Sequence, residues 1–263
     1  MPERTSYAQG TPSWVDLSSP DVEASEAFYG ALFGWDSGGA TEAPEDSGGY
    51  EIFTLHGRRV AGIAPLMAPD QPIVWSTYLA VDDADEVAEK AVAAGGRLVI
   101  EPMDVLQAGR MAGFVDTSGA FVGVWQAREH IGAEVVNEPG SVGWNDLMTR
   151  DTAAAEAFYP VVFGIEAAPW ENAGSQYTVW NVGGRTVGGL VQMGESWPPE
   201  APPHWMTYFI VEDADATAAM AEVHGGSIRV EPFDVPNIGR IGVLADPHGA
   251  VFSIMTAVGP GDG

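Results

Sequence analysis

Apolar and polar residues alternate along residues 14–18, which read WVDLS. Val15 and Leu17 are aliphatic and share one parity, whereas the residues between them are aromatic or polar, and this period of two predicts a strand. Asp21 is placed as the N-cap of a helix whose apolar residues recur at helical spacing, and Gly34 is placed to end that helix. The first predicted elements are therefore a strand and a helix with one apolar face.

The same two patterns continue through the rest of the first half. Strands are predicted over 50–55, 58–66, 75–81, 97–101, 110–115 and 121–126, with a second helix over 83–94. The Glu-Pro pairs at Glu101-Pro102 and Glu231-Pro232 are expected to mark strand ends, because proline cannot donate to a ladder. The order strand, helix, strands occurs twice in each half, and the chain as a whole is predicted to hold four βαβββ units in two pairs.

The two halves of the chain repeat one another. The segment WVDLSSPDVEASEAFYGALFG begins at Trp14, and WNDLMTRDTAAAEAFYPVVFG begins at Trp144, 130 positions later. The register slips by three in the middle, where Tyr50 meets Tyr177, and compensating loop lengths explain the slip. Self-similarity of this length predicts two homologous domains, over 1–132 and 140–258, joined by a short polar linker near residues 131–140.

Three short segments carry a resemblance to a known family. They are LSSPDVEASEAFYGALFGW from Leu17, DTSGAFVGVW from Asp116 and its twin DPHGAVFSIM from Asp246. Together with the order of the units, they resemble the glyoxalase/bleomycin resistance/dioxygenase superfamily, also called vicinal oxygen chelate, in a tandem two-domain form. The resemblance covers nearly the whole chain. It implies an α+β fold in which the four βαβββ units pair into two half-open barrel domains, each with a concave sheet face.

The family often carries a divalent metal on that concave face, held by His, Gln or Glu. In this chain the corresponding positions hold Trp14, Ser76 and Gly123 in the first half and Trp144, Met206 and Ser253 in the second, and the places near Gly62 and Gly189 also lack a ligand. The five histidines show no metal-binding spacing and are expected at turns or on the surface: His56, His130, His204, His224 and His248. We therefore expect no metal and no cofactor.

Composition narrows the class of partner. The formal net charge is −26, with 37 acidic and 11 basic residues, so nucleic acid and anionic membrane surfaces are unfavourable partners. The absence of cysteine removes thiolate nucleophiles and thiolate metal sites. No GxSxG elbow and no strand–GxGxxG–helix setting is present, so hydrolase triads and phosphate loops gain no support. The first residues, MPERTSYAQG, contain no apolar signal-like run, and a cytoplasmic location is expected.

Strand parity selects candidate binding residues. Because Val15 and Leu17 should pack on the helix, Trp14 and Asp16 are left for the concave face, and Trp144 and Asp146 follow in the second half. The other predicted ligand-binding residues are Tyr78, Arg110, Phe121, Trp125, Tyr208, Arg240 and Met255. Arg110 and Arg240 are interpreted either as partners of the two carboxylates or as ligand contacts. The competing interpretation of the aromatic residues is that they only fill the barrel core.

Two classes of function remain. The first is metal-independent binding of a hydrophobic or aromatic metabolite or drug on the concave face, which needs no catalytic base. The alternative is a glyoxalase-like lyase or isomerase acting next to a carbonyl, for which Asp16 and Asp146 are the candidate catalytic residues. A ring-cleaving dioxygenase would need a His-His-Glu iron site, which the sequence lacks. A small molecule is the expected partner, and the protein is expected to be a monomer or a homodimer.

Overall fold

The computed structural model describes residues 3–37, 48–170 and 177–257. The first half contains β1 (Pro12–Ser19), α1 (Val22–Phe33), β2 (Glu51–Leu55), β3 (Arg58–Pro65), β4 (Trp75–Ala80), α2 (Ala84–Ala93), β5 (Arg97–Val105), β6 (Gly109–Val115) and β7 (Phe121–Ala127). The second half contains β8 (Val142–Thr149), α3 (Thr152–Phe163), β9 (Glu166–Pro169), β10 (Tyr177–Val182), β11 (Arg185–Gln192), β12 (His204–Ile210), α4 (Ala214–Val223), β13 (Ser227–Val235), β14 (Gly239–Ala245) and β15 (Val251–Ala257). Among the described helices, none is long and apolar enough to cross a membrane.

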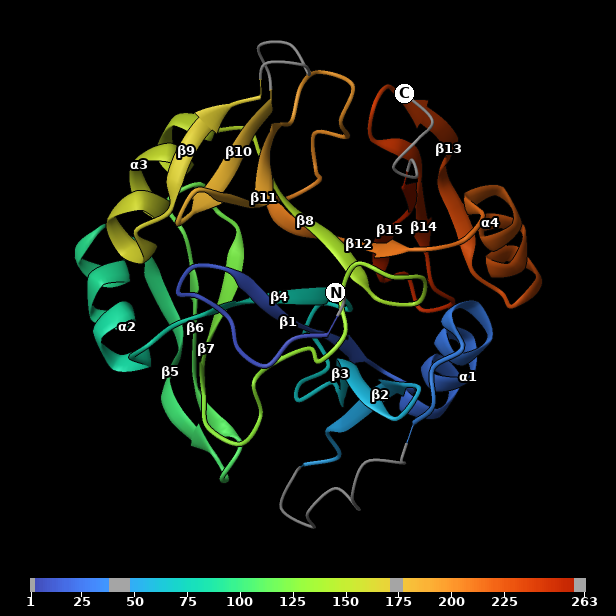
Figure 1. The fold of residues 1–263 in the computed structure, drawn as a ribbon, viewed down its shortest axis with the longest axis horizontal. Helices are drawn as coiled ribbons and strands as arrows, with labels where there is room; N and C mark the ends of the chain where they lie inside the picture. The colour runs from blue at the N-terminus through green and yellow to red at the C-terminus, as the bar shows by residue number, and fades with distance from the viewer. Residues whose placement is uncertain (1–2, 38–47, 171–176, 258–263) are drawn as a thin grey trace.

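Each half forms one open sheet, and the predicted α+β class is confirmed (Figure 1). The strand order is β2-β3-β1-β4-β7-β6-β5 in the first half and β13-β14-β15-β12-β8-β11-β10-β9 in the second. The two units of a half meet where their first strands pair antiparallel, β1 with β4 and β8 with β12. The paired units therefore share a single continuous sheet rather than two separate sheets that face each other.

The first helix begins and ends where the sequence predicts. The side chain of Asp21 accepts a hydrogen bond from the backbone N–H of Ala24 at 3.0 Å, which satisfies one of the free donors of the first turn. Gly34 ends α1 with φ of 70°, a left-handed conformation that glycine adopts without strain. Asp151 and Gly164 perform the same roles for α3. Local sequence therefore fixes the helix ends in both halves.

The repeated Glu-Pro does not end its strand, contrary to the sequence prediction. β5 runs from Arg97 through Pro102 to Val105, and β13 likewise runs through Pro232. Both strands lie at a sheet edge, where a missing N–H costs no ladder bond on the open side. The pairing of β5 with β6 shifts register between Ile100 and Met103, so the proline lies in an irregular stretch that both edge strands tolerate.

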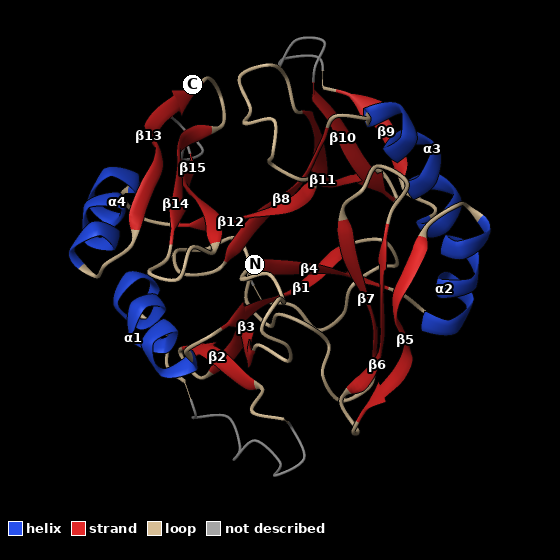
Figure 2. Cartoon of the chain, turned by 180° about the vertical axis from the view of Figure 1, so that it is seen from behind, coloured by secondary structure: helices blue, strands red, loops and turns tan. Residues whose placement is uncertain are grey.

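The hydrophobic core is shared between the halves. One cluster joins Phe28 and Tyr29 of α1 to Phe209 of β12 and Phe252 of β15, and the other joins Phe114 of β6 to residues of α3. Helix α1 accordingly lies beside α4, and α2 lies beside α3 (Figure 2). Val15 and Leu17 belong to the first cluster, so their predicted packing on the helix side is confirmed. Because each core needs elements of both halves, neither half encloses its own.

Two buried tyrosines connect the halves by hydrogen bonds. Tyr29 of α1 donates to Asp246 at 3.1 Å, and Tyr159 of α3 donates to Asp116 at 2.7 Å. Each hydroxyl also accepts from a tryptophan, Trp75 or Trp205. The Phe-Tyr of the helix and the Asp of the late turn, which recur in both halves, are therefore the two ends of cross-half contacts.

The segment between the halves is not the exposed polar linker that its composition indicates. The backbone N–H groups of Ala133 and Glu134 donate to the carbonyls of Ser13 and Arg59, so this segment passes between β1 and β3. Val135 is only 3 % exposed and belongs to the shared core. The connection is thus packed into the fold, because it fills the gap that opens where β1 and β3 stop pairing.

Candidate functional site

One face of each sheet curves around a small cluster of side chains. In the first half this cluster includes Trp14, Tyr78 and Trp125, together with Ile52 from β2 and Val105 from β5. Strands β2 and β5 are the two edges, which would lie about 29 Å apart in a flat sheet of this size. The sheet must therefore be strongly curved. We call this face the first concave face and the corresponding face, with Trp144, Met206 and Tyr208, the second concave face.

A carboxyl group lies on the first concave face among hydroxyl and indole groups. The Tyr50 hydroxyl donates to Asp16 Oδ2 at 3.4 Å, and Trp14 Nε1 donates to the Tyr50 hydroxyl at 2.7 Å. Burial raises the pKa of Asp16 to about 7, and hydrogen bonds from Tyr78 and Tyr50 lower it only in part. Part of Asp16 stays open to solvent. This carboxyl can therefore change its charge near neutral pH.

His130 covers one end of the first concave face. Its ring packs edge-on against Trp14 at a centroid distance of 4.4 Å and lies 5.5 Å from Trp125, whose Nε1 donates to the His130 carbonyl. The expectation of a surface histidine is wrong for His130, which is 8 % exposed, because the segment after β7 folds back over the sheet. Burial, and then the charge of Arg59, lowers its pKa to about 4, so the ring is neutral at physiological pH.

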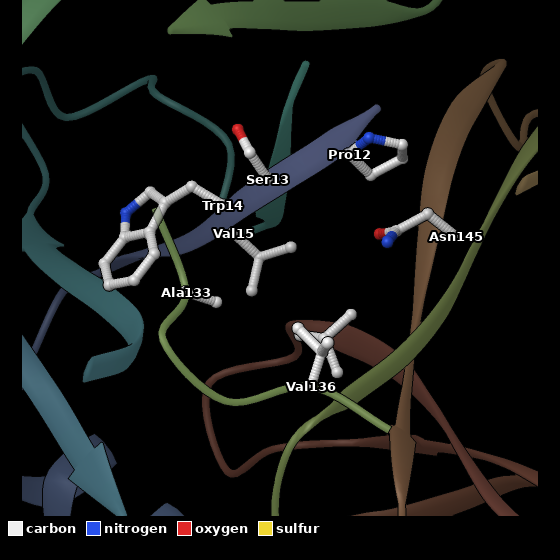
Figure 3. A pocket seen from close by; sticks show the side chains of 8 residues that line it. Pro12, Ser13, Trp14, Val15, Ala133, Val136 and Asn145 are labelled. Atoms are coloured by element: carbon white, nitrogen blue, oxygen red, sulfur yellow. The ribbon is translucent and has the colours of Figure 1, made fainter. Parts of the chain in front are cut away.

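The enclosed space near Trp14 is too small for a metabolite. A cavity of about 20 Å³ lies between β1, the connecting segment and β8, with room for about one water molecule. The lining side chains include Val15, Ala133, Val136 and Asn145 (Figure 3). This cavity belongs to the junction of the two halves, because residues of β1, of the connecting segment and of β8 line it. It is a packing gap and not a ligand site.

The second concave face carries the equivalent carboxyl in a tighter network. Asp146 Oδ1 accepts from Trp144 Nε1 at 2.8 Å and from the Tyr177 hydroxyl at 2.8 Å. Burial raises the pKa of Asp146, against the effect of hydrogen bonds from Tyr177, Trp144 and Tyr208. Asp146 is only 4 % exposed, whereas Trp144 is half-buried. In this half the indole, and not the carboxyl, is presented toward the outside.

Methionines surround this second network. Met148, Met193 and Met206 form its buried cluster with Tyr208, and Trp144 and Trp197 pack against it. Met255 lies half-buried on the same face of β15, near Gly143. Flexible, polarisable methionines beside aromatic rings make a surface that adapts to flat apolar molecules. The side chains of the second concave face are therefore more flexible and less polar than those of the first concave face.

The positions at which the family resemblance predicts metal ligands are filled by groups that do not fit a metal. Asp16 is paired across the sheet with Gly62 on β3 and Ser76 on β4, and Asp146 with Gly189 and Met206. Among residues 3–37, 48–170 and 177–257, no three His, Asp or Glu side chains lie close enough together to hold a metal ion. A single carboxylate with tyrosine neighbours supplies too few hard ligands for Fe, Mn, Ni or Zn.

Two tyrosines that the sequence analysis left out of the site complete both networks. A Cβ at Gly62 would collide with the hydroxyl of Tyr50, and a Cβ at Gly189 with that of Tyr177. Each tyrosine thus occupies the space that a side chain from the neighbouring strand would take, next to the carboxyl. The available signal was the register slip between the halves, which aligns Tyr50 with Tyr177.

The predicted arginines lie away from the carboxylates. Arg110 binds Asp85 at 2.6 Å and Asp104 at 3.1 Å, and Arg240 binds Asp215 and Asp234 in the same way. Their pairing with Asp16 and Asp146 is therefore not observed, and tyrosines take that role instead. Phe121 lies half-buried on β7 near Gly113, toward the rim of the first concave face. The structure thus brings Trp14, Asp16, Tyr78 and Trp125 together, and Trp144, Asp146 and Tyr208 together.

Sequence relatives match over nearly the full length. "Putative glyoxylase CFP32" of Mycobacterium tuberculosis is 46 % identical over 261 residues, covering 97 % of this chain and 98 % of the relative. "Anthracycline biosynthesis protein DnrV" of Streptomyces peucetius is 42 % identical over 265 residues, covering 95 % of this chain and 94 % of the relative.

Solved structures share the fold at low sequence identity. The Mn(II)-bound glyoxalase from Novosphingobium aromaticivorans aligns with a TM-score of 0.65 at 17 % identity, over 95 % of this chain and 82 % of the other. The 2,3-dioxygenase LapB from Pseudomonas sp. KL28 aligns with a TM-score of 0.64 at 14 % identity, over 97 % and 96 %. The family model matches residues 11–124 and again residues 141–254. Because these matches cover nearly all of both sheets, the chain belongs to the Glyoxalase/Bleomycin resistance protein/Dioxygenase superfamily.

Proposed function

We propose that the protein binds a hydrophobic or aromatic small molecule on the second concave face, without a metal. The observation that carries this proposal is the half-buried indole of Trp144, whose Nε1 is held by both Asp146 and Tyr177. Two hydrogen bonds fix the plane of the ring before any ligand arrives, so little conformational entropy is lost on stacking. Met206 and Trp197 beside it offer further apolar contact area.

Metal independence is supported by the chemistry of the donor set. Asp146 already accepts hydrogen bonds from an indole and a phenol, and the strands beside it present a glycine and a methionine. A metal would have to displace these donors and would still lack nitrogen or carboxylate ligands. The protein therefore holds its ligand by stacking, apolar contact and hydrogen bonds.

The side chains of the second concave face indicate the class of ligand, and the sequence relatives support it. A flat ring system suits a surface of indole, phenol and thioether groups. Relatives named anthracycline biosynthesis proteins, 41–42 % identical over almost the whole chain, indicate planar polycyclic aromatic compounds as the first class to test. A drug or an aromatic metabolite of this shape is the proposed ligand.

The test is a titration with 1,4-dihydroxyanthraquinone in the presence of EDTA. Tryptophan fluorescence is the signal that reports binding. Trp144→Ala should weaken binding on the order of tenfold, since aromatic stacking adds about 1 kcal/mol beyond the area buried. Trp14→Ala is the matched control, because Trp14 is 5 % exposed and covered by His130. Equal loss in both variants, or binding that requires an added metal, would contradict the proposal. Circular dichroism of both variants verifies that they fold.

A second candidate function, a lyase or isomerase acting next to a carbonyl, is favoured by one observation. Asp16 is partly open to solvent and its pKa is raised to about 7, which suits a group that moves a proton at neutral pH. This activity is tested by measuring, with NMR, deuterium exchange at the carbon next to the carbonyl of simple ketones. Exchange that disappears in Asp16→Asn supports catalysis, and an exchange rate equal to that of buffer rules it out for those ketones.

A further inference from the structure

The internal duplication provides two copies of one carboxyl group in different surroundings. Asp146 receives hydrogen bonds from Trp144 and Tyr177 at 2.8 Å each and is 4 % exposed. Asp16 has the same neighbours by sequence and accepts from Tyr78 and Tyr50, yet the bond from Tyr50 is 3.4 Å long, no indole reaches the carboxyl, and the residue is partly open to solvent. The carboxyl in the second half is enclosed by its protein donors, whereas the carboxyl in the first half has one donor fewer and stays partly open to solvent.

The two carboxyls differ because the indole N–H groups of the two halves donate to different acceptors. In the second half Nε1 of Trp144 reaches Asp146 directly. In the first half Nε1 of Trp14 donates to the Tyr50 hydroxyl instead, at 2.7 Å, while His130 packs against the indole ring. Asp16 therefore keeps acceptor capacity that no indole uses.

The ring of side chains around the two carboxyls differs in polarity. Ser76 lies directly across the sheet from Asp16, and Ser18 follows two residues along β1 on the same face. Gln71 Nε2 donates to the Ser18 hydroxyl at 3.0 Å, which brings an amide to the same rim. The equivalents of the two serines around Asp146 are Met206 and Met148. The first half thus surrounds its open carboxyl with hydrogen-bond acceptors, and the second half surrounds its closed one with thioethers.

Among the described residues, no Lys, Arg or His side chain forms an ion pair with Asp16. The ion pairs of the described residues engage Arg58, Lys90, Arg110, Arg128 and Arg240 with other acidic groups. The titratable groups that face Asp16 are the phenols of Tyr50 and Tyr78, from the segment before β2 and from β4. A partly buried carboxylate is costly without a positive partner. The net charge of −26 creates a field that concentrates cations near the protein.

We propose that Asp16 anchors a second ligand site in the first half, and that this site takes an organic ammonium ion. The ammonium supplies the missing positive charge to the carboxylate, and its remaining N–H groups have the Ser18, Ser76 and Tyr50 oxygens as acceptors nearby. This site differs from the proposed aromatic site in its half, its wall and the charge of its ligand.

The affinity of the Asp16 site for an ammonium ion is expected to depend on pH. Burial raises the pKa of Asp16 to about 7, and an ammonium ion beside it favours the ionised form. Binding below pH 7 must therefore release a proton. The dissociation constant should rise about tenfold from pH 8 to pH 6, whereas the ammonium itself stays protonated throughout.

The experiment is a titration of the whole chain with n-butylammonium, with 1-butanol as the neutral isostere. Chemical shifts of the tryptophan indole N–H groups report the half, because Trp14 Nε1 bonds Tyr50 and Trp144 Nε1 bonds Asp146. The signal of Trp14 should move and that of Trp144 should stay. Asp16→Asn should weaken binding on the order of tenfold or more, the loss of one charge-assisted hydrogen bond, and Asp146→Asn should not.

A second variant keeps the test decisive if Asp16→Asn folds poorly. Ser76→Met copies the second half at the position opposite Asp16 and leaves the carboxyl in place, so it should also weaken ammonium binding. Met206→Ser is its matched control and should have no effect. Equal binding of 1-butanol, or unchanged affinity in Asp16→Asn and Ser76→Met, would overturn the proposal. Binding of aromatic ligands at Trp144 is a separate measurement, and its outcome does not decide this one.

Discussion

Tyr159→Phe isolates one of the two hydrogen bonds that connect the halves. The Tyr159 hydroxyl is fully buried, donates to Asp116 Oδ2 at 2.7 Å and accepts from Trp205 Nε1 at 2.9 Å. Phenylalanine keeps the ring and its packing against Phe163 and Trp180, so the change removes little more than one oxygen atom. Any loss of stability then reports on the hydrogen bonds.

The expected magnitude follows from the two lost partners. A hydrogen bond to a charged group contributes about 1.5–3 kcal/mol, and leaving the buried Trp205 N–H without an acceptor costs about 1–3 kcal/mol. The carboxylate of Asp116 keeps its bonds from the backbone N–H groups of Ser118 and Ala120, which limits the damage to one of its oxygens. We expect the free energy of unfolding to fall by about 2–5 kcal/mol in total. In a protein of this size that lowers Tm by roughly 5–15 °C.

Urea denaturation and calorimetry measure this change, and a double-mutant cycle with Asp116→Asn assigns it. Coupling between the two substitutions of about 1 kcal/mol or more is expected, because they share one hydrogen bond. Tyr29→Phe, the twin in the other core cluster, should cost somewhat less, since its bond to Asp246 is 3.1 Å long. A loss below about 0.5 kcal/mol for Tyr159→Phe, or strict additivity with Asp116→Asn, would refute the reasoning.

Three further predictions concern pH, the separate halves and metal content. Because burial raises the folded-state pKa of Asp16 from 3.8 to about 7, the unfolded chain loses this proton first, so the free energy of unfolding should fall as pH rises from about 4 to about 7 and level off above. Asp16→Asn should flatten this part of the profile, and an unchanged slope would contradict the assignment. Residues 1–137 expressed alone should associate or remain unfolded, because the core around Phe28 and Tyr29 needs Phe209 and Phe252; a stable monomer in sedimentation experiments would show otherwise. Elemental analysis after growth in metal-rich medium should find no stoichiometric transition metal, since Trp14, Ser76 and Gly123 stand where ligands are needed; one equivalent of Ni, Zn, Fe or Mn that survives dialysis would be the contrary result.

The sequence by itself determined the features that depend on neighbours along the chain. Side chains alternate across a strand, so the aliphatic character of Val15 and Leu17 already sends Trp14 and Asp16 to the opposite face. The helix ends at Asp21 and Gly34 likewise follow from local backbone chemistry. The duplication predicted four units, and the family resemblance supplied their pairing into two curved sheets.

Only the tertiary structure decided which groups meet those residues. Asp16 meets Tyr50, which is 34 positions away, because the register of β3 places Gly62 beside the carboxyl and leaves room for a phenol. His130 was expected at the surface, but the path of the connecting segment buries it against Trp14. Parity and capping are properties of a few consecutive residues. The partners of a side chain depend on strand register, sheet curvature and the packing of one half on the other, and no local pattern encodes these.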